Sequence, residues 1–178
     1  MGERAYASES KKLRIMFARS RDVPFYVGGG FADLGITGKD IVAESGASVA
    51  TLLELPFGFC RLVLAARGNN GVSSARDLNG KRVATSFPNL AQRFLAEYSV
   101  IARVVRLEGA VEASVTAGIA DAIIDLTSTG ATLKANGLRE VECLLKSSAV
   151  LIANRSVAES AEVAEFVEKL AREAKKKC

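Results

Sequence analysis

The chain has 178 residues, of which 49% are hydrophobic, so it can bury a core in one domain or in two small ones. No apolar run approaches the roughly 20 residues that span a bilayer, and the N-terminal stretch MGERAYASESKKLRIMF lacks the features of a secretory signal; we therefore expect a soluble, cytoplasmic protein without membrane contacts. The net charge is only +4 and 6% of the residues are aromatic, which argues against nucleic-acid binding and suits a small polyanionic substrate.

The residue types that are missing narrow the possible chemistry. There is no histidine, which excludes Ser-His and Cys-His nucleophilic mechanisms and metal centres built on imidazole. Cys60, Cys143 and Cys178 are odd in number and have no C-x-x-C spacing, so neither a disulfide framework nor a zinc site is indicated. The remaining chemistry depends on charge, hydroxyl groups and the positioning of substrates.

Strand-like and helix-like patterns alternate along the chain, which predicts an α/β fold. Apolar runs predict strands at 13–18, 34–37, 52–55, 62–66, 82–86, 103–106, 122–126 and 149–153. The segment FPNLAQRFLAEYSV has the spacing of an amphipathic helix, and a last helix is predicted at about 160–176.

A loop-rich stretch, ARGNNGVSSARDLNGK, separates two sets of predicted strands. We therefore expect two lobes with a cleft between them: residues 1–67 together with 148–178 form the first lobe, and residues 68–147 form the second. In folds of this kind ligands bind at strand ends, in the cleft.

The segment DAIIDLTSTGATL, residues 121–133, is the strongest candidate for a binding site. An apolar strand ends at a carboxylate, several hydroxyl-bearing residues and a glycine follow, and a helical pattern begins at once. This order favours an anion site for a phosphate group. The alternative is that Ser128 or Thr129 merely caps the helix. The candidate residues are Asp125, Thr127, Ser128, Thr129, Gly130 and Thr132.

Two more strand ends carry polar residues. In ADLGITGKD, Thr37 and Gly38 either line the cleft from the other lobe or form a tight turn that needs glycine for its geometry. In ARSRDVP, Arg19 is the candidate cation because it ends a predicted strand, whereas Arg21 is interpreted as an ordinary surface arginine.

Four blocks together resemble the ATP phosphoribosyltransferase family, which opens histidine biosynthesis: RDVPFYVGGGFADLGITGKD, FGFCRLVLA, ATSFPNLAQRFL and EGAVEASVTAGIADAIIDLTSTGATLKANGL. The resemblance runs from about Arg19 to Asn154. It implies a two-lobed fold of the periplasmic-binding-protein type II class. It also implies the condensation of ATP with 5-phosphoribosyl 1-pyrophosphate, in the presence of Mg²⁺, to N1-(5-phosphoribosyl)-ATP and pyrophosphate.

The resemblance also assigns roles to residues. Asp125 would hold ribose hydroxyls, Arg19 would face the pyrophosphate, and Thr37 with Gly38 would line the cleft. The remaining candidates, Thr127, Ser128, Thr129, Gly130 and Thr132, would cradle the 5′-phosphate. The implied partners are a second copy of the chain and a regulatory subunit related to histidyl-tRNA synthetase.

The chain also departs from the family pattern. It resembles the short form, without a regulatory C-terminal domain, and nothing in it matches the family's first strand, basic loop and first helix. Ser20 stands where many members carry proline. The alternatives are a non-catalytic binding module of the same two-lobed fold, a catalytically inactive paralogue, or an incomplete chain.

Overall fold

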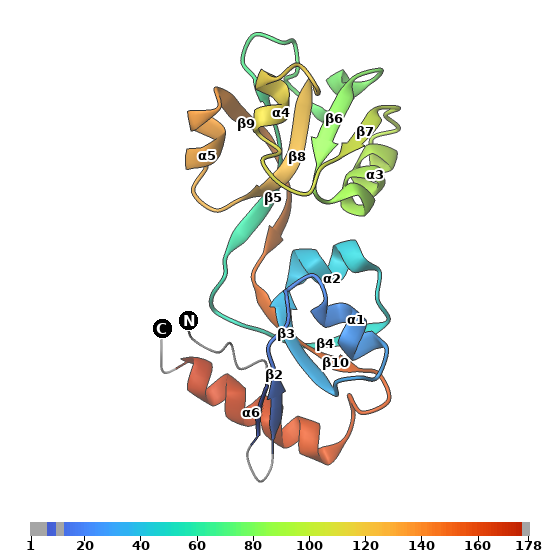
Figure 1. The fold of residues 1–178 in the computed structure, drawn as a ribbon, viewed down its shortest axis with the longest axis vertical. Coiled ribbons are helices and arrows are strands. Elements are labelled where there is room, and N and C mark those ends of the chain that lie inside the picture. The colour runs from blue at the N-terminus through green and yellow to red at the C-terminus, as the bar shows by residue number, and fades with distance from the viewer. Residues whose placement is uncertain (1–6, 10–12, 176–178) are drawn as a thin grey trace.

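The computed structural model describes residues 7–9 and 13–175, which form ten strands and six α-helices within those ranges (Figure 1). The strands are β1 (Ala7–Glu9), β2 (Arg14–Met16), β3 (Leu34–Gly38), β4 (Val49–Glu54), β5 (Cys60–Arg67), β6 (Arg82–Thr85), β7 (Arg103–Arg106), β8 (Ala122–Thr127), β9 (Leu138–Ser147) and β10 (Ala149–Asn154). The helices are α1 (Val23–Gly28), α2 (Lys39–Ser45), α3 (Pro88–Glu97), α4 (Ala113–Thr116), α5 (Ala131–Ala135) and α6 (Ala161–Lys175), with a 3₁₀ turn, η1 (Ala75–Leu78). Three parts of the sequence lie outside the described residues: the predicted helix end at residue 176, Cys178, and most of the first twelve residues.

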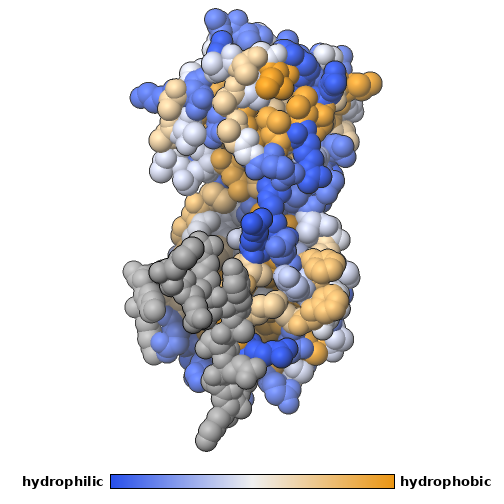
Figure 2. Space-filling model, in the orientation of Figure 1, coloured by the Kyte–Doolittle hydropathy of each residue, from blue (hydrophilic) through white to orange (hydrophobic). Residues whose placement is uncertain are grey.

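The strands form two main sheets, and each sheet is the centre of one lobe. The first lobe contains the three-stranded sheet β3-β10-β4, in which both neighbours run antiparallel to β10, and helices α1, α2 and α6. The second lobe contains the five-stranded sheet β7-β6-β8-β5-β9, in which β7, β6 and β8 are parallel and β5 runs antiparallel to both of its neighbours. The predicted α/β, two-lobed architecture is confirmed. The molecule narrows between the lobes, where strongly hydrophilic side chains lie (Figure 2).

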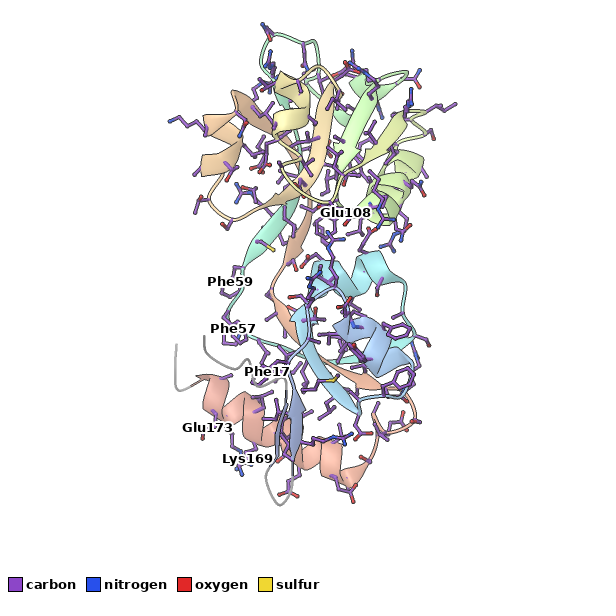
Figure 3. The ribbon with its side chains drawn as sticks, in the orientation of Figure 1. Phe17, Phe57, Phe59, Glu108, Lys169 and Glu173 are labelled. Atoms are coloured by element: carbon purple, nitrogen blue, oxygen red, sulfur yellow. The ribbon has the colours of Figure 1, made fainter. Side chains whose placement is uncertain are left out.

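The first crossing between the lobes lies earlier in the chain than the sequence indicated. The expected range 1–67 placed residues 60–67 in the first lobe. In the structure β5 pairs with β8 and β9, so these residues belong to the sheet of the second lobe. The crossing segment is residues 55–59, from which Phe57 and Phe59 project at more than half exposure (Figure 3). The loop-rich stretch after Arg67 is a connection within the second lobe, containing η1. We therefore propose a first lobe of 13–59 with 148–175 and a second lobe of 60–147.

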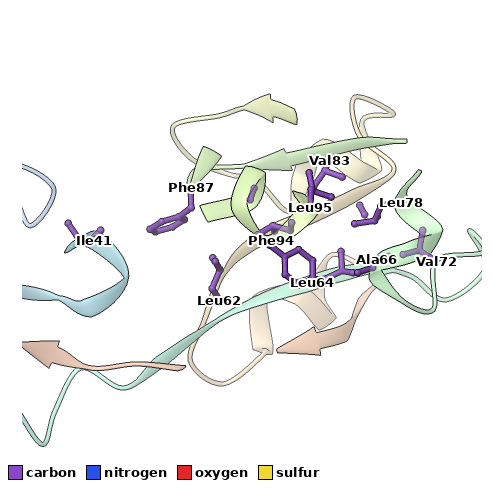
Figure 4. Packing of buried hydrophobic residues seen from close by; sticks show 14 residues of the cluster. Ile41, Leu62, Leu64, Ala66, Val72, Leu78, Val83, Phe87, Phe94 and Leu95 are labelled. Atoms are coloured by element: carbon purple, nitrogen blue, oxygen red, sulfur yellow. The ribbon is translucent and has the colours of Figure 1, made fainter. Parts of the chain in front are cut away.

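The core of the second lobe follows from alternation along its central strands. On β5, Leu62, Leu64 and Ala66 pack on one side of the sheet with Phe94 and Leu95 of α3 (Figure 4). The intervening Val63 and Ala65 pack on the other side, against residues of α4, α5 and their neighbouring loops. Side chains alternate across a strand, so the burial of both sets means that both faces of this sheet are covered. A strand buried on both faces has a continuous apolar run, as in β5 and β8.

The helices owe their positions to apolar stripes. α3 begins with Pro88, whose fixed φ angle suits the first turn of a helix, and it buries Ala91, Phe94 and Leu95. α6, with 15 residues, buries Val163 and contacts β4. Among the described helices, none combines the length and the apolar character that crossing a membrane requires.

Candidate functional site

A cleft of about 460 Å³ lies where the two lobes meet. The first lobe contributes the turn that carries Arg19, Ser20 and Arg21, together with Ile41 of α2. The second lobe contributes the ends of two parallel neighbouring strands: Ser86 and Phe87 after β6, and Asp125 and Leu126 on β8. The cleft therefore has a cationic wall on one lobe and a wall of hydroxyl and carboxylate groups on the other.

The arginine turn, residues 19–22, is fixed by two hydrogen bonds. The backbone N–H of Asp22 donates to the carbonyl of Arg19 at 2.9 Å, which closes the turn before α1. The hydroxyl of Thr37, which is 5% exposed, donates to the carbonyl of Ser20 at 2.8 Å. Thr37 therefore supports the turn from β3, and Gly38 is the N-cap residue of α2; neither is among the residues that line the cleft.

Arg21 joins the two lobes across the cleft. Its Nη2 atom donates to the carbonyl of Ser86 at 2.9 Å, and its guanidinium carbon lies 4.7 Å from the centre of the Phe87 ring. A guanidinium over an aromatic face is an attractive arrangement, and Phe87 is almost completely buried. The interpretation of Arg21 as an ordinary surface arginine was wrong.

Arg19 is the cation that is left for a ligand. It lines the cleft, and within the part of the chain that the structure describes its guanidinium has neither a hydrogen-bond partner nor an ion-pair partner. The guanidinium offers five N–H donors in a planar fork that matches phosphate oxygens. An anion in the cleft can therefore bind Arg19 without breaking an existing contact.

Asp125 is the acidic group of the cleft. Burial raises the pKa of its carboxyl group above the ordinary value, although the hydrogen bonds from the N–H of Leu126 and from the Ser86 hydroxyl act in the opposite direction. Glu112 raises the same pKa by charge repulsion, and Arg21 lowers it. Asp125 is thus a desolvated acceptor, suited to hydroxyl groups that donate hydrogen bonds.

The hydroxyl loop, residues 127–132, begins two residues after Asp125 and leads into the short helix α5. Two of its side chains accept hydrogen bonds from the loop backbone. Thr127 Oγ1 accepts from the N–H of Gly130 at 2.9 Å, and Thr129 Oγ1 accepts from the N–H of Ala131 at 3.3 Å. Gly130 has φ = 79°, a left-handed conformation that favours glycine. Over the described ranges, the N–H groups of Ser128 and Thr129 have no protein acceptor, so both are free to donate to a ligand.

Arg61 supports the hydroxyl loop from the adjacent strand β5. Its Nη1 atom donates to the carbonyl of Ser128 at 2.9 Å, and its Nη2 atom bonds Glu140 of β9 at 2.7 Å. Bonds to two groups hold the guanidinium in place, and Glu140 raises its pKa by hydrogen bonding. The loop backbone is therefore anchored to β5 and, through Glu140, to β9.

The structure brings Arg19 and Asp125 to the same cleft. The hydroxyl loop follows Asp125 in the chain. The sequence patterns did not indicate a role in the site for Arg21, Ser86 or Phe87. The block ATSFPNLAQRFL contained a usable signal for Ser86, because a hydroxyl residue follows a strand and precedes a helix that begins with proline.

The described residues do not contain a group of three or more acidic or cysteine side chains that could hold a metal ion. Mg²⁺ is commonly held by one or two carboxylates together with substrate phosphates. Among the described residues Asp125 is the one carboxylate that lines the cleft, and this donor set fits an ion that arrives bound to phosphates.

Comparisons with known proteins agree with this geometry. The family model described as ATP phosphoribosyltransferase matches residues 19–172. Curated relatives named ATP phosphoribosyltransferase include that of Gemmatimonas aurantiaca, 50% identical over 85% of this chain and 53% of the relative. Another is that of Leptospira biflexa, 42% identical over 86% of this chain and 74% of the relative. The chain spans about half the length of several of the curated relatives it matches.

Solved structures give the same answer at the level of the fold. An ATP phosphoribosyl transferase (HisG:HisZ) complex from Thermotoga maritima contains a chain that matches with a TM-score of 0.87 and 31% identity, covering 98% of this chain and 86% of that one. The arginine-bound form of truncated ArgBP from T. maritima matches with a TM-score of 0.58 at 19% identity, over 85% of this chain and 72% of that one, which concerns the fold alone. Since the family model covers the arginine turn, the cleft and the hydroxyl loop, this chain belongs to the ATP phosphoribosyltransferase family.

Proposed function

We propose that this chain carries the catalytic site of an ATP phosphoribosyltransferase, which joins ATP to 5-phosphoribosyl 1-pyrophosphate. The observation that carries the proposal is the pairing, across one cleft, of the unpartnered Arg19 with the Asp125 strand end and its hydroxyl loop. In this reaction a nitrogen of the adenine ring forms a bond to the anomeric carbon of the ribose, and the bond from that carbon to pyrophosphate breaks.

Each group then has a role that its environment supports. Asp125, a partly buried acceptor, holds the ribose hydroxyls, and the free N–H groups of Ser128 and Thr129 bind the 5′-phosphate. Thr127, Gly130 and Thr132 complete the hydroxyl loop, in which Thr127 fixes the turn through the Gly130 N–H.

Arg19 faces the leaving pyrophosphate and stabilises the charge that develops on it. Such a displacement requires no nucleophilic side chain and no histidine, because orientation of two substrates and electrostatic stabilisation supply most of the rate. Thr37 and Gly38 act indirectly: Thr37 holds the carbonyl of Ser20 and so fixes the direction of the arginine turn.

Mg²⁺, when bound to the substrate phosphates, would supply neutralisation of the charge on the pyrophosphate. Asp125, the carboxylate that lines the cleft among the described residues, would be the group of this chain that contacts such an ion. The chain's own contribution is the cationic wall at Arg19 and the donors of the hydroxyl loop.

We propose two protein partners. The first is a second copy of the chain. The second is a regulatory subunit of the histidyl-tRNA-synthetase-like kind, because the T. maritima relative was solved as a HisG:HisZ complex. Light scattering of the chain alone and mixed with a candidate subunit tests both assemblies.

Two experiments test the function. The first is calorimetry with phosphoribosyl pyrophosphate, ATP and histidine in turn. The second is incubation of the chain with both substrates and Mg²⁺. The chain should bind phosphoribosyl pyrophosphate, and formation of phosphoribosyl-ATP should be followed by absorbance, alone and with the regulatory subunit. Binding without product under both conditions would favour the alternative, a non-catalytic binding module of the same fold.

A further inference from the structure

The C-terminal end of α2 in the first lobe contacts the first turn of α3 in the second. Glu44, which is only 8% exposed, directs both carboxylate oxygens at that turn. Oε1 accepts from the N–H of Asn89 at 3.0 Å, and Oε2 accepts from the N–H of Leu90 at 2.8 Å. The contact is reciprocal, because Asn89 Nδ2 donates to the carbonyl of Glu44 at 2.9 Å and Arg93 Nη2 to the carbonyl of Ala43 at 2.8 Å.

α3 cannot cap itself at this end. Its N-cap residue is Phe87, whose side chain has no acceptor, and its first residue is Pro88, which has no N–H group. The N–H of Ala91 already bonds the carbonyl of Phe87, which leaves Asn89 and Leu90 as the donors of the first turn. A carboxylate suits the positive end of the helix dipole, and here it comes from the other lobe.

The same contact determines where the cleft residues lie. Ser86 and Phe87 immediately precede α3, and both bind Arg21 of the first lobe. Ile41, one helical turn before Glu44, belongs to the same apolar cluster as Phe87, so α2 also packs against this point (Figure 4). A change in the distance between α2 and α3 therefore moves Ser86 and Phe87 relative to the arginine turn.

We propose that Glu44 is an interlobe latch, a positioning residue that holds the two lobes closed by capping α3 from the opposite lobe. When the lobes separate, the carboxylate and two helix N–H groups must be rehydrated together, so the cap opposes opening. Glu44 is not among the described residues that line the cleft, and the proposal requires no catalytic activity of the chain.

The latch is tested on the full chain without substrate, by hydrogen exchange and small-angle X-ray scattering. Glu44→Ala should speed exchange of the Asn89 and Leu90 amides at least about tenfold, since each bond to a charged group contributes enough for a factor of that size. The radius of gyration should increase, while amides of the β5–β8 ladder exchange at the wild-type rate. Glu97→Gln, at the other end of the same helix and exposed, is the matched control and should change neither quantity.

Glu44→Gln provides the second variant if the alanine variant does not fold. It keeps one acceptor oxygen and loses the charge, so its exchange rates should lie between those of wild type and Glu44→Ala. The proposal is overturned if the amides of Asn89 and Leu90 keep their protection, or if the melting temperature falls while the radius of gyration stays at the wild-type value. Because no substrate is present, failure here leaves the proposed function untouched, and the reverse also holds.

Discussion

The hydroxyl of Ser86 donates to Oδ1 of Asp125 at 3.0 Å, which couples the ends of two adjacent parallel strands at the cleft. Parallel strands end at the same edge of a sheet, so the hydroxyl that follows β6 reaches the carboxylate on β8. The bond orients the carboxylate, and burial keeps it poorly solvated, which raises its pKa. The charged form of Asp125 therefore lowers the stability of the folded chain.

Asp125→Asn should stabilise the chain at neutral pH and weaken phosphoribosyl pyrophosphate binding. The pKa of Asp125 is raised in the folded state. Its contribution to folding stability is therefore fully present below its ordinary pKa of 3.8 and is lost as the pH rises through the raised value. The variant should therefore melt about 2–4 °C above wild type at pH 7–8, with a smaller difference near pH 3.5. Scanning calorimetry across this range measures it. The exposed Asp33→Asn is the control, and an Asp125→Asn variant less stable than wild type at pH 8 would contradict the argument.

Asp121→Asn should destabilise the chain in the opposite pH window. Asp121 accepts from the side chain and the N–H of Arg82, and these bonds lower its pKa to about 2. Its stabilisation is present above pH 3.8 and is lost as the pH falls through about 2. Because the side chains of Arg82 and Asp121 are 41% and 35% exposed, solvent screens the pair, and we expect a loss of about 1 kcal/mol at pH 7.

Chemical denaturation at pH 7 and near pH 2 checks this prediction. The difference between Asp121→Asn and wild type should shrink toward the lower pH. Glu168→Gln removes a far more exposed pair with Arg172 and should have almost no effect at either pH. A constant difference between the two pH values would show that the hydrogen bonds act independently of the charge.

Thr129→Val tests the hydroxyl loop. The hydroxyl of Thr129 makes a long bond of 3.3 Å to the Ala131 N–H, so its removal should disturb the fold little. We expect phosphoribosyl pyrophosphate to bind more weakly by about 1–3 kcal/mol, because the Thr129 hydroxyl is lost as a donor to the 5′-phosphate, with the melting temperature nearly unchanged. Calorimetric titration measures the affinity, and Thr51→Val on the exposed side of β4 serves as the control. Unchanged affinity, or loss of the fold, would indicate a structural role for the loop.

Arg19→Ala should lower turnover of an active assembly by roughly a hundredfold while changing ATP binding much less, because the charge on the leaving pyrophosphate develops in the transition state. Steady-state kinetics, with ATP affinity measured separately, distinguishes the two effects. Arg14→Ala, on the exposed strand β2, should leave both quantities as they are. Losses of equal size in turnover and in affinity would remove the assigned role.

The sequence predicted the strands with buried faces well, because their apolar runs depend on local composition. The range 122–126 corresponds to β8, and 149–153 to β10. β9 was missed. Its ten residues, LREVECLLKS, alternate poorly between polar and apolar types, and its register shifts twice against β5. At each shift β9 has one extra residue, so the side chains beyond it point to the other face and the period of two is interrupted.

The contacts between the lobes could not be predicted from the sequence. Arg21 and Glu44 resemble ordinary surface residues in their local surroundings, and their partners, Ser86 and Asn89, lie 65 and 45 residues further along the chain. The loop-rich stretch after Arg67 was mistaken for a lobe boundary because glycine and asparagine mark turns, whether or not the chain changes lobes there.

The position of β10 affects how the chain folds during synthesis. β10 is the central strand of the first sheet, and both β3 and β4 pair with it and with no other described strand. During translation β3 and β4 are synthesised about a hundred residues before β10. Their hydrogen-bonding edges therefore stay unpaired while the whole second lobe is synthesised. The second lobe is continuous from Cys60 to Ser147, residues that pair with each other, and it can fold as soon as it emerges. The order of assembly is therefore the reverse of the order of translation, with the lobe begun first completed last.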